Sequence, residues 1–242
     1  VPSTQVFTDL SGTNANDTLG ADASFQKIYG LDGNDRITVS TAGAVAYGGT
    51  GSDYVTNGAA DQKLYGDAGN DILVASDGND ELYGGADNDA LQGGADDDYL
   101  EGNEGNDVLD GGAGGDVLVG GEGSDVLLGG GSIVPGFLPA WNPNDIPDFG
   151  VLVANGVAGL NNMAGYLNIE GDAADVLDGG AGNDTLFAGD GDDLLKGGSE
   201  DDLLDGQAGN DTLEGGEGAD LLYGDGTQGD ISVGGLDPYT LA

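Results

Sequence analysis

The sequence has no cysteine and no histidine among its 242 residues, and only four lysines and arginines. Without histidine the chain cannot build a Ser-His-Asp triad or an imidazole zinc site. Without cysteine it has no disulfide framework. The 45 aspartates and glutamates give a formal net charge of −41. Such a charge repels phosphate, so we expect no nucleic-acid partner and no attraction to anionic membranes.

Long hydrophobic runs are also missing. The longest, such as residues 151–154 (VLVA), are too short to span a bilayer. Leu, Ile, Val and Phe account for 55 of the 242 residues, little more than the ~20% below which highly charged chains stay disordered. The 51 glycines add to the conformational entropy lost on folding. The composition therefore predicts that divalent cations must neutralise the acidic groups before the chain can fold.

What the chain has instead is a nine-residue repeat. Residues 111–119 read GGAGGDVLV, residues 120–128 read GGEGSDVLL, and residues 179–187 read GGAGNDTLF. The unit is G-G-x-G-x-D-x-U-x, in which U is a large aliphatic residue at the eighth position. The eighth position can be followed without a break through thirteen units, from Leu19 to Leu127, and again through six units, from Leu177 to Leu222.

Each unit combines a sharp turn with a short strand. In the D-x-U-x part, the two-residue period of a strand places U on one face and its neighbours on the other. The G-G-x-G-x-D part must turn tightly, and glycine supplies the positive φ angles that this requires. Such a turn directs carbonyl oxygens inward. With an aspartate carboxylate they form an all-oxygen cage, which suits Ca²⁺ better than zinc or copper.

This pattern resembles the repeats-in-toxin (RTX) family, the hemolysin-type calcium-binding repeats. The resemblance implies an all-β fold, a calcium-stabilised parallel β-roll or β-solenoid with 18 residues per turn and calcium held between stacked turns. In this chain the roll is interrupted by one long insert. A disordered Gly/Asp-rich tract is the alternative, but disorder requires neither the strict period nor the aliphatic eighth position.

We predict that the sixth-position aspartates are the calcium ligands, together with backbone carbonyls of the turns. The aspartates are Asp17, Asp35, Asp53, Asp71, Asp80, Asp89, Asp98, Asp107, Asp116, Asp125, Asp175, Asp184, Asp193, Asp202, Asp211 and Asp220. Examples of the carbonyl donors are those of Gly84, Gly85, Ala86, Gly102, Asn103, Glu104, Gly105, Gly179 and Ala181.

The two sides of such a roll are not alike, because alternate units stack on opposite sides. From Gly12 onward, every unit of one side has aspartate at position six, whereas the other side begins with Gln26, Ala44 and Gln62. We therefore expect calcium along the whole of one side and only from about Ser76 on the other. In the first block, six spaces lie between successive aspartate loops on one side and two on the other. The second block has four. The expected total is about a dozen Ca²⁺.

Two further features lie on the side that lacks aspartate. Lys27 and Lys63 either replace calcium charge there, or form a docking edge for a preceding domain, or are solvated strand residues. Four tyrosines at the ninth position are spaced by 18 residues and should stack about 4.8 Å apart. Their ladder either stabilises the roll or offers an aromatic platform to a sugar or a protein. They are Tyr29, Tyr47, Tyr65 and Tyr83.

The chain divides into five parts by composition. The insert contains four of the six prolines, together with Trp141 and Met163. It is a loop that folds back over part of the roll, or a recognition element anchored by Trp141, or the seam between two rolls. Val6, Phe7 and Leu10 would cap the open end of the core. The parts are an N-terminal cap (1–11), a first β-roll block (12–128), a Pro-rich apolar insert (129–169), a second block (170–223) and a C-terminal tail or linker (224–242).

These features predict a calcium-binding module of a secreted or cell-surface bacterial protein, disordered without Ca²⁺ and folding outside the cell. The resemblance implies export by type I secretion. The alternative is an adhesion or ligand-binding module, in which the roll presents the insert or the tyrosine ladder to a protein or carbohydrate. Because the repeats leave no room for a catalytic domain, we predict no enzyme. The chain begins at Val1, and we expect a monomeric fragment with neighbouring domains in a larger protein and no membrane span.

Overall fold

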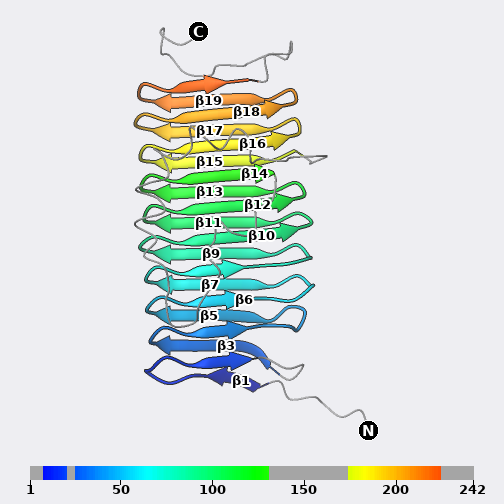
Figure 1. Ribbon diagram of the computed structural model, residues 1–242, viewed down its shortest axis with the longest axis vertical. Helices are drawn as coiled ribbons and strands as arrows, with labels where there is room; N and C mark the ends of the chain where they lie inside the picture. The colour runs from blue at the N-terminus through cyan, green and yellow to red at the C-terminus, as the bar shows by residue number, and fades with distance from the viewer. Residues whose placement is uncertain (1–7, 21–24, 131–173, 225–242) are drawn as a thin grey trace.

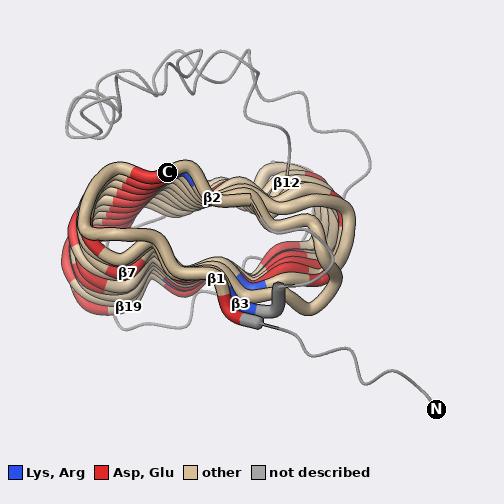
Figure 2. Tube along the Cα trace, turned by 90° about the horizontal axis from the view of Figure 1, so that it is seen from below, with Lys and Arg blue, Asp and Glu red and all other residues tan. Residues whose placement is uncertain are grey.

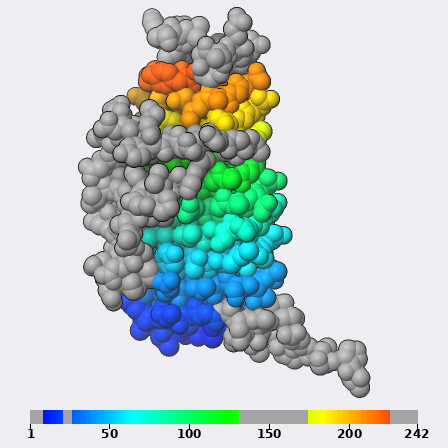
Figure 3. All heavy atoms as spheres, turned by 45° about the vertical axis from the view of Figure 1, so that its right-hand side comes forward, coloured from blue at the N-terminus to red at the C-terminus, as the bar shows by residue number. Residues whose placement is uncertain are grey.

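The computed structural model describes residues 8–20, 25–130 and 174–224, which form strands and, within these ranges, no helix. The chain winds as a flattened solenoid whose turns stack in sequence order along the long axis (Figure 1). The space-filling view shows the same order, from the N-terminal to the C-terminal turns of one elongated body (Figure 3). Each turn contributes one strand to each of two ten-stranded sheets.

The odd-numbered strands form one sheet, called here the odd sheet. They are β1 (Thr8–Ser11), β3 (Phe25–Asp32), β5 (Val45–Thr50), β7 (Lys63–Ala68), β9 (Glu81–Ala86), β11 (Tyr99–Glu104), β13 (Val117–Glu122), β15 (Val176–Ala181), β17 (Leu194–Ser199) and β19 (Thr212–Glu217).

The even-numbered strands form the other sheet, called the even sheet. They are β2 (Thr18–Gly20), β4 (Arg36–Thr38), β6 (Tyr54–Thr56), β8 (Ile72–Val74), β10 (Ala90–Ala95), β12 (Val108–Ala113), β14 (Val126–Gly130), β16 (Thr185–Asp190), β18 (Leu203–Ala208) and β20 (Leu221–Tyr223).

All neighbouring strands in both sheets pair in parallel, and the register advances by 18 residues per turn except across the insert, where it advances by 59. Leu64 pairs with Leu82, for example. The predicted parallel β-roll is therefore confirmed. The structure adds one strand that the repeat pattern does not contain, because β1 precedes the first repeat and pairs with β3. Leu10 of β1 is half-buried against the core, whereas Val6 and Phe7 lie outside the described residues.

The roll is continuous across the insert. Strand β13 pairs directly with β15 through Leu118 and Leu177, and β14 pairs with β16. The interpretation of the insert as a seam between two rolls is therefore wrong. Strand β14 extends to Gly130, so the roll continues two residues into the segment predicted as insert. Residues 131–173, with Trp141, and residues 225–242 of the predicted tail lie outside the described residues.

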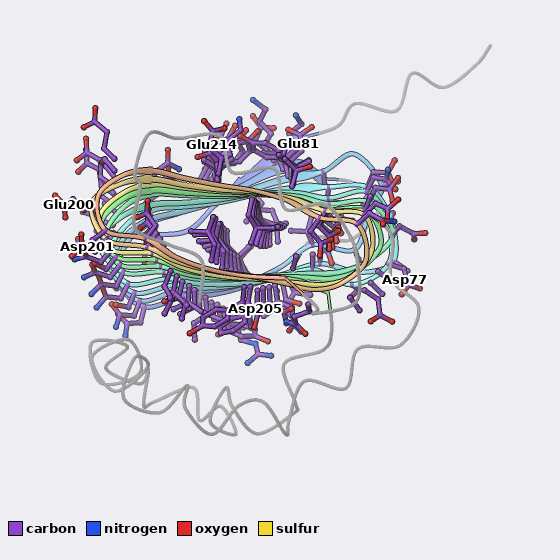
Figure 4. The ribbon with its side chains drawn as sticks, turned by 90° about the horizontal axis from the view of Figure 1, so that it is seen from above. Asp77, Glu81, Glu200, Asp201, Asp205 and Glu214 are labelled. Atoms are coloured by element: carbon purple, nitrogen blue, oxygen red, sulfur yellow. The ribbon has the colours of Figure 1, made fainter. Side chains whose placement is uncertain are left out.

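A narrow aliphatic core runs the length of the roll. The eighth-position side chains point inward from both sheets and form two facing rows, visible as ladders of carbon atoms in Figure 4. From Ile28 to Leu213 the members of these rows are at most 2% exposed. Leu10 and Leu19 at one end, and Leu222 at the other, are only partly buried. Each half-turn thus contributes one large side chain to the core.

The loops that join the two sheets form two rims. We call the loops from odd to even strands the first rim and the loops from even to odd strands the second rim. Acidic residues line both rims in rows that run along the roll (Figure 2). In the view along the axis, Glu200 and Asp201 project from the first rim and Asp77 from the second (Figure 4). The insert leaves and rejoins the roll at one loop of the second rim, between β14 and β15.

Two adjacent leucines of β17 test the position of the core. Leu195 is fully buried, and Leu194 is half-buried on the outer face. We expect Leu195→Ala to lower the free energy of unfolding by about 2–5 kcal/mol, because it leaves a cavity. Leu194→Ala should lower it by less than about half as much. Urea unfolding in calcium-containing buffer measures both, and equal losses would contradict the assigned inward face.

Candidate metal centre

All sixteen predicted aspartates lie in the described residues, where the fold gathers them into two rows at the bases of the rim loops. Those inside the rows are at most 7% exposed, and Asp17 and Asp220 at the ends are half-buried. The first rim holds Asp17, Asp35, Asp53, Asp71, Asp89, Asp107, Asp125, Asp184, Asp202 and Asp220. The second rim holds Asp80, Asp98, Asp116, Asp175, Asp193 and Asp211.

In all of these aspartates except Asp17, whose carboxylate accepts from Thr13 of its own loop, one oxygen links two turns. The Asp53 Oδ1 accepts a hydrogen bond of 2.6 Å from the backbone N–H of Asp35, and Asp107 accepts one of 2.7 Å from Asp89. The same bond crosses the insert on the second rim, from the Asp116 N–H to Asp175, where the partners are 59 residues apart instead of 18. Apart from Asp17, each aspartate therefore fixes the loop of the preceding turn.

In nine of these carboxylates the other oxygen is buried and has no hydrogen-bond donor. Because an unpaired buried carboxylate oxygen is energetically unfavourable, a row of such atoms indicates that a cation belongs beside it. This arrangement fits Ca²⁺, which binds oxygen ligands. The unpaired atoms are the Oδ2 atoms of Asp35, Asp53, Asp71, Asp89, Asp98, Asp107, Asp125, Asp184 and Asp202.

The first-position glycines bring a backbone carbonyl to the same place. A Cβ atom at Gly84 would overlap both the Asp89 Oδ2 and the Gly102 carbonyl oxygen. Likewise, at Gly120 it would overlap the Asp125 Oδ2 and the Gly179 carbonyl oxygen. Glycine is therefore needed for the close approach of two oxygen atoms from successive turns. Among the predicted carbonyl donors, Gly84, Gly102 and Gly179 have this position.

The other predicted carbonyl donors have different surroundings. The carbonyls of Ala86 and Ala181, at the third position, accept hydrogen bonds from Gly69 and Gly123 of the preceding turn. Gly85, Asn103 and Glu104 belong to the paired strands β9 and β11, and the Gly105 N–H donates to the Glu122 carbonyl. No three acidic side chains converge on one point within the described ranges, so backbone oxygens must complete any coordination shell there.

Without a cation nearby, burial disfavours the ionised form of these carboxylates. It raises the pKa of Asp71 to about 9 and that of Asp89 to about 10, and neighbouring carboxylates raise both pKa values further. The pKa of Asp98 rises to about 8, and those of Asp107 and Asp125 to about 7, again through burial. Hydrogen bonds from the preceding turn oppose these shifts only in part. A divalent cation would favour the ionised form.

Comparison with known proteins agrees with this geometry. The profile of the RTX calcium-binding nonapeptide repeat (four copies) matches residues 11–40, 65–100, 101–132, 171–204 and 196–228, which is more than half of the chain. The chain belongs to this family. RTX repeats are structural calcium-binding units, which accords with a roll built from them. No curated protein matches the chain. Within the described part of the chain, no helix is long and apolar enough to cross a membrane.

The loops that depart from the RTX pattern are filled with neutral side chains. On the second rim, Val39 and Ala44 replace the first-position glycine and the sixth-position aspartate, and both are buried in the core. In the next loop Asn57 and Gln62 replace the same pair and are also buried. The Gln62 Nε2 donates to the Thr41 carbonyl at 3.0 Å. These loops therefore lack the buried negative charge that distinguishes the aspartate loops.

The predicted tyrosine ladder is present on the outer face of the odd sheet. Tyr29, Tyr47, Tyr65 and Tyr83 stack with ring centroids 4.8–5.0 Å apart and planes within 10° of parallel. Nearby, Lys63 is exposed and pairs with Glu81.

Lys27 is also exposed, with its Nζ 6.0 Å from the centre of the Tyr47 ring. Both lysines project from strands rather than into rim loops, as expected for solvated strand residues. They do not lie where the aspartate carboxylate and its cation would lie in the other rim loops.

Sequence reasoning missed a second row of hydrogen bonds at the fifth position of the repeat. The Asn88 Oδ1 accepts from the Asn106 N–H at 2.7 Å, and the Asn106 Oδ1 accepts from the Ser124 N–H at 2.7 Å. This outer row runs opposite to the aspartate row, because each side chain binds the following turn. Its signal in the sequence is the recurrence of asparagine at a position that the repeat motif leaves open.

The requirement for glycine beside aspartate can be tested at Gly102. We expect Gly102→Val to weaken calcium binding and to destabilise the roll, because its side chain would displace the Asp107 carboxylate. Adding Asp107→Ala should recover part of the stability, since Val39 and Ala44 form such a pair naturally, but it should not recover calcium binding. Urea unfolding and calcium calorimetry measure the two effects. Gly20→Ala, where a Cβ meets no atom within 4 Å, is the control.

The raised pKa values predict how pH affects the calcium-free roll. Protons bind more tightly to Asp71 and Asp89 in the folded chain than in an unfolded one, where the pKa is about 4. The stabilising effect of these protons is therefore complete below about pH 4 and is lost as pH rises towards 9 to 10. In EDTA, β-structure measured by circular dichroism should decrease from pH 4 to pH 8. With calcium, the opposite trend is expected, because protons compete with the ion.

Proposed function

We propose that the chain is a calcium-dependent folding module of a secreted or cell-surface bacterial protein. The observation that carries this proposal is the row of buried, unpaired Oδ2 atoms beside first-position carbonyls. The sixteen sixth-position aspartates are the proposed side-chain ligands. In this role calcium neutralises the carboxylates and links successive turns, and no catalytic step is part of the proposal.

Calcium concentration then decides where the module folds. A net charge of −41 opposes compaction, and the aspartate rows bring many like charges close together. Calcium sites of extracellular modules bind in the range of about 10⁻⁴–10⁻³ M, well above cytosolic calcium levels. The chain would thus stay unfolded inside the cell, pass through a type I secretion system and fold outside. The free energy of calcium binding becomes free energy of folding.

The continuous roll changes the expected number of ions. Treating the two blocks separately gives about twelve spaces between successive aspartate loops. The structure adds one space on each rim, between Asp125 and Asp184 and between Asp116 and Asp175. We therefore propose about fourteen Ca²⁺, on the whole length of the first rim and from Asp80 onward on the second.

The adhesion alternative has less support from the tyrosine ladder. A sugar usually packs on the face of an aromatic ring, but these rings cover one another's faces at 4.8–5.0 Å. Stacking of this kind stabilises neighbouring strands. We propose that the ladder strengthens the N-terminal turns, where the second rim has no aspartate. The insert, the other candidate for ligand binding, lies outside the described residues.

A calcium titration from EDTA to ~10 mM, followed by far-UV circular dichroism, tests the proposal. We expect a cooperative transition from coil to β-structure with calcium and none with magnesium at the same concentration. Asp89→Asn should raise the calcium midpoint at least about threefold, because it removes the charge of a buried ligand. A β-signal that is complete in EDTA at neutral pH would refute the proposal.

Asp87→Asn is the matched control for this experiment. It lies in the same loop and removes the same charge, but Asp87 is exposed and is not a sixth-position ligand. Asparagine also tolerates the positive φ of 76° at this position. The calcium midpoint of this variant should stay within about twofold of the parent. Equal shifts in the two variants would indicate that only the total charge matters, not a specific ligand.

A further inference from the structure

The outer faces of the two sheets differ in a way that the repeat does not explain. Residues at the seventh and ninth positions point outward from either sheet. On the odd sheet, none of the outward residues whose exposure the structure describes is buried. On the even sheet six of them are buried, at 0–8% exposure. These six are Ile72, Ala90, Asp110, Val126, Leu128 and Thr185.

The buried outward residues form one continuous patch, which we call the even face. It extends from β8 to β16, where the half-buried side chains of Val74, Val108 and Phe187 join it, and it is mainly apolar apart from Asp110 and Thr185. Beyond it, Arg36 and Tyr54 on one side and Leu203 on the other are half-buried. Asp205 points away from this sheet (Figure 4). The patch is therefore local and does not follow from the sheet itself.

Two valines show that strand neighbours alone do not produce this burial. Val117 and Val126 occupy the same repeat position on successive strands of the winding, β13 and β14. Val117, on the odd sheet, is half-buried, whereas Val126, on the even sheet, is 8% exposed. Leu128, at the ninth position, is only 3% exposed. Side chains that point away from the roll become so buried only if further polypeptide lies against them.

We propose that residues 131–173 of this chain pack on the even face. The segment leaves the roll at Gly130, at the end of β14 and at the edge of this face, and returns at Ala174. The distance from β8 to β16 is four strand spacings, or about 19 Å, which a chain of this length spans easily. Its sequence supplies apolar side chains to match the face, among them Ile133, Phe137, Leu138, Trp141 and Phe149.

In this arrangement, residues 131–173 cover the even face. A contiguous apolar surface exposed on a soluble roll would promote association with other molecules, and the tethered segment covers it without a second chain. The segment acts as an outer layer on one sheet only, because the odd sheet has a charged and aromatic outer face with Lys63, Glu81 and Tyr83. The inference depends on burial in the roll and not on the proposed calcium-dependent folding.

The reactivity of single introduced thiols tests this proposal, because the chain has no cysteine of its own. Ala90→Cys places a thiol on the even face, two strands of that sheet away from β14, where the segment begins, and Val117→Cys places the matched control on the odd sheet. Both are measured in the full chain with calcium and in a variant in which Ala-Gly replaces residues 131–173. That replacement restores an ordinary six-residue turn, GGAGAD, and with it the nine-residue spacing at the loop.

We expect the thiol at position 90 to react with a water-soluble maleimide at least about 10-fold more slowly than the thiol at position 117 in the full chain. Replacing the segment should raise the rate at position 90 to that at position 117 and leave the control within about twofold. A reactive thiol at position 90 in the full chain would overturn the proposal. So would a thiol that stays protected in a monomeric chain without the segment.

Two further measurements separate cover by the segment from cover by a second copy of the chain and from a folding defect. If a second copy covers the face, protection in the full chain will decrease on dilution, and the proposal fails. If the shortened chain does not give the β-signal with calcium, a full-length variant with serine at positions 133, 137, 138, 141 and 149 takes its place. The same increase in reactivity at position 90 is expected there, and an unchanged rate overturns the proposal.

Discussion

The structure depends on a carboxylate that is buried between two turns of the chain. One of its oxygens holds the backbone of the preceding turn, as in the 2.6 Å bond from Asp35 to Asp53. The other lies beside a glycine and a carbonyl oxygen with no donor in reach. A negative charge at such a point is unfavourable by itself, and it is repeated along both rims. Positive charge beside these carboxylates, as protons or metal ions, would make the stacking of the turns more favourable.

The core beside these carboxylates is narrow. Each half-turn adds one aliphatic side chain to it, such as Leu100 or Leu109, and the facing rows leave no second layer. Where aspartate is missing from the second rim, the chain uses other means of stabilisation. Val39 and Ala44 extend the apolar core into the loop, and tyrosines stack on the outer face. Some rim loops thus contain a buried aspartate and others contain packed neutral side chains. The N-terminal turns contain both kinds of loop.

Much of the fold follows from the sequence, because the nine-residue period specifies both the inward residue and the turn. Leu64, Leu82 and Leu100 could be placed in one row, and Asp71 and Asp89 in another, from their spacing alone. The Asn88 and Asn106 ladder could not, since the repeat motif leaves the fifth position open. The sequence alone also did not predict that the roll is continuous across the insert. The 50 residues from Leu127 to Leu177 are not a multiple of nine, and only strand pairing shows that the added length leaves at one loop. The burial of Leu128 on the outer face does not follow from the nine-residue period either.

The place of that loop has a consequence for how such rolls can change. Residues 131–173 stand where an ordinary unit has only its third and fourth residues, yet the hydrogen bonds from Asp116 to Asp175 and from Asp125 to Asp184 have the same 2.7 Å length as those in uninterrupted turns. An insertion in a rim loop therefore leaves the strand register unchanged on either side. A roll of this kind can acquire an appendage in a single genetic step. The same property makes its rim loops natural grafting points for a chosen peptide or small domain.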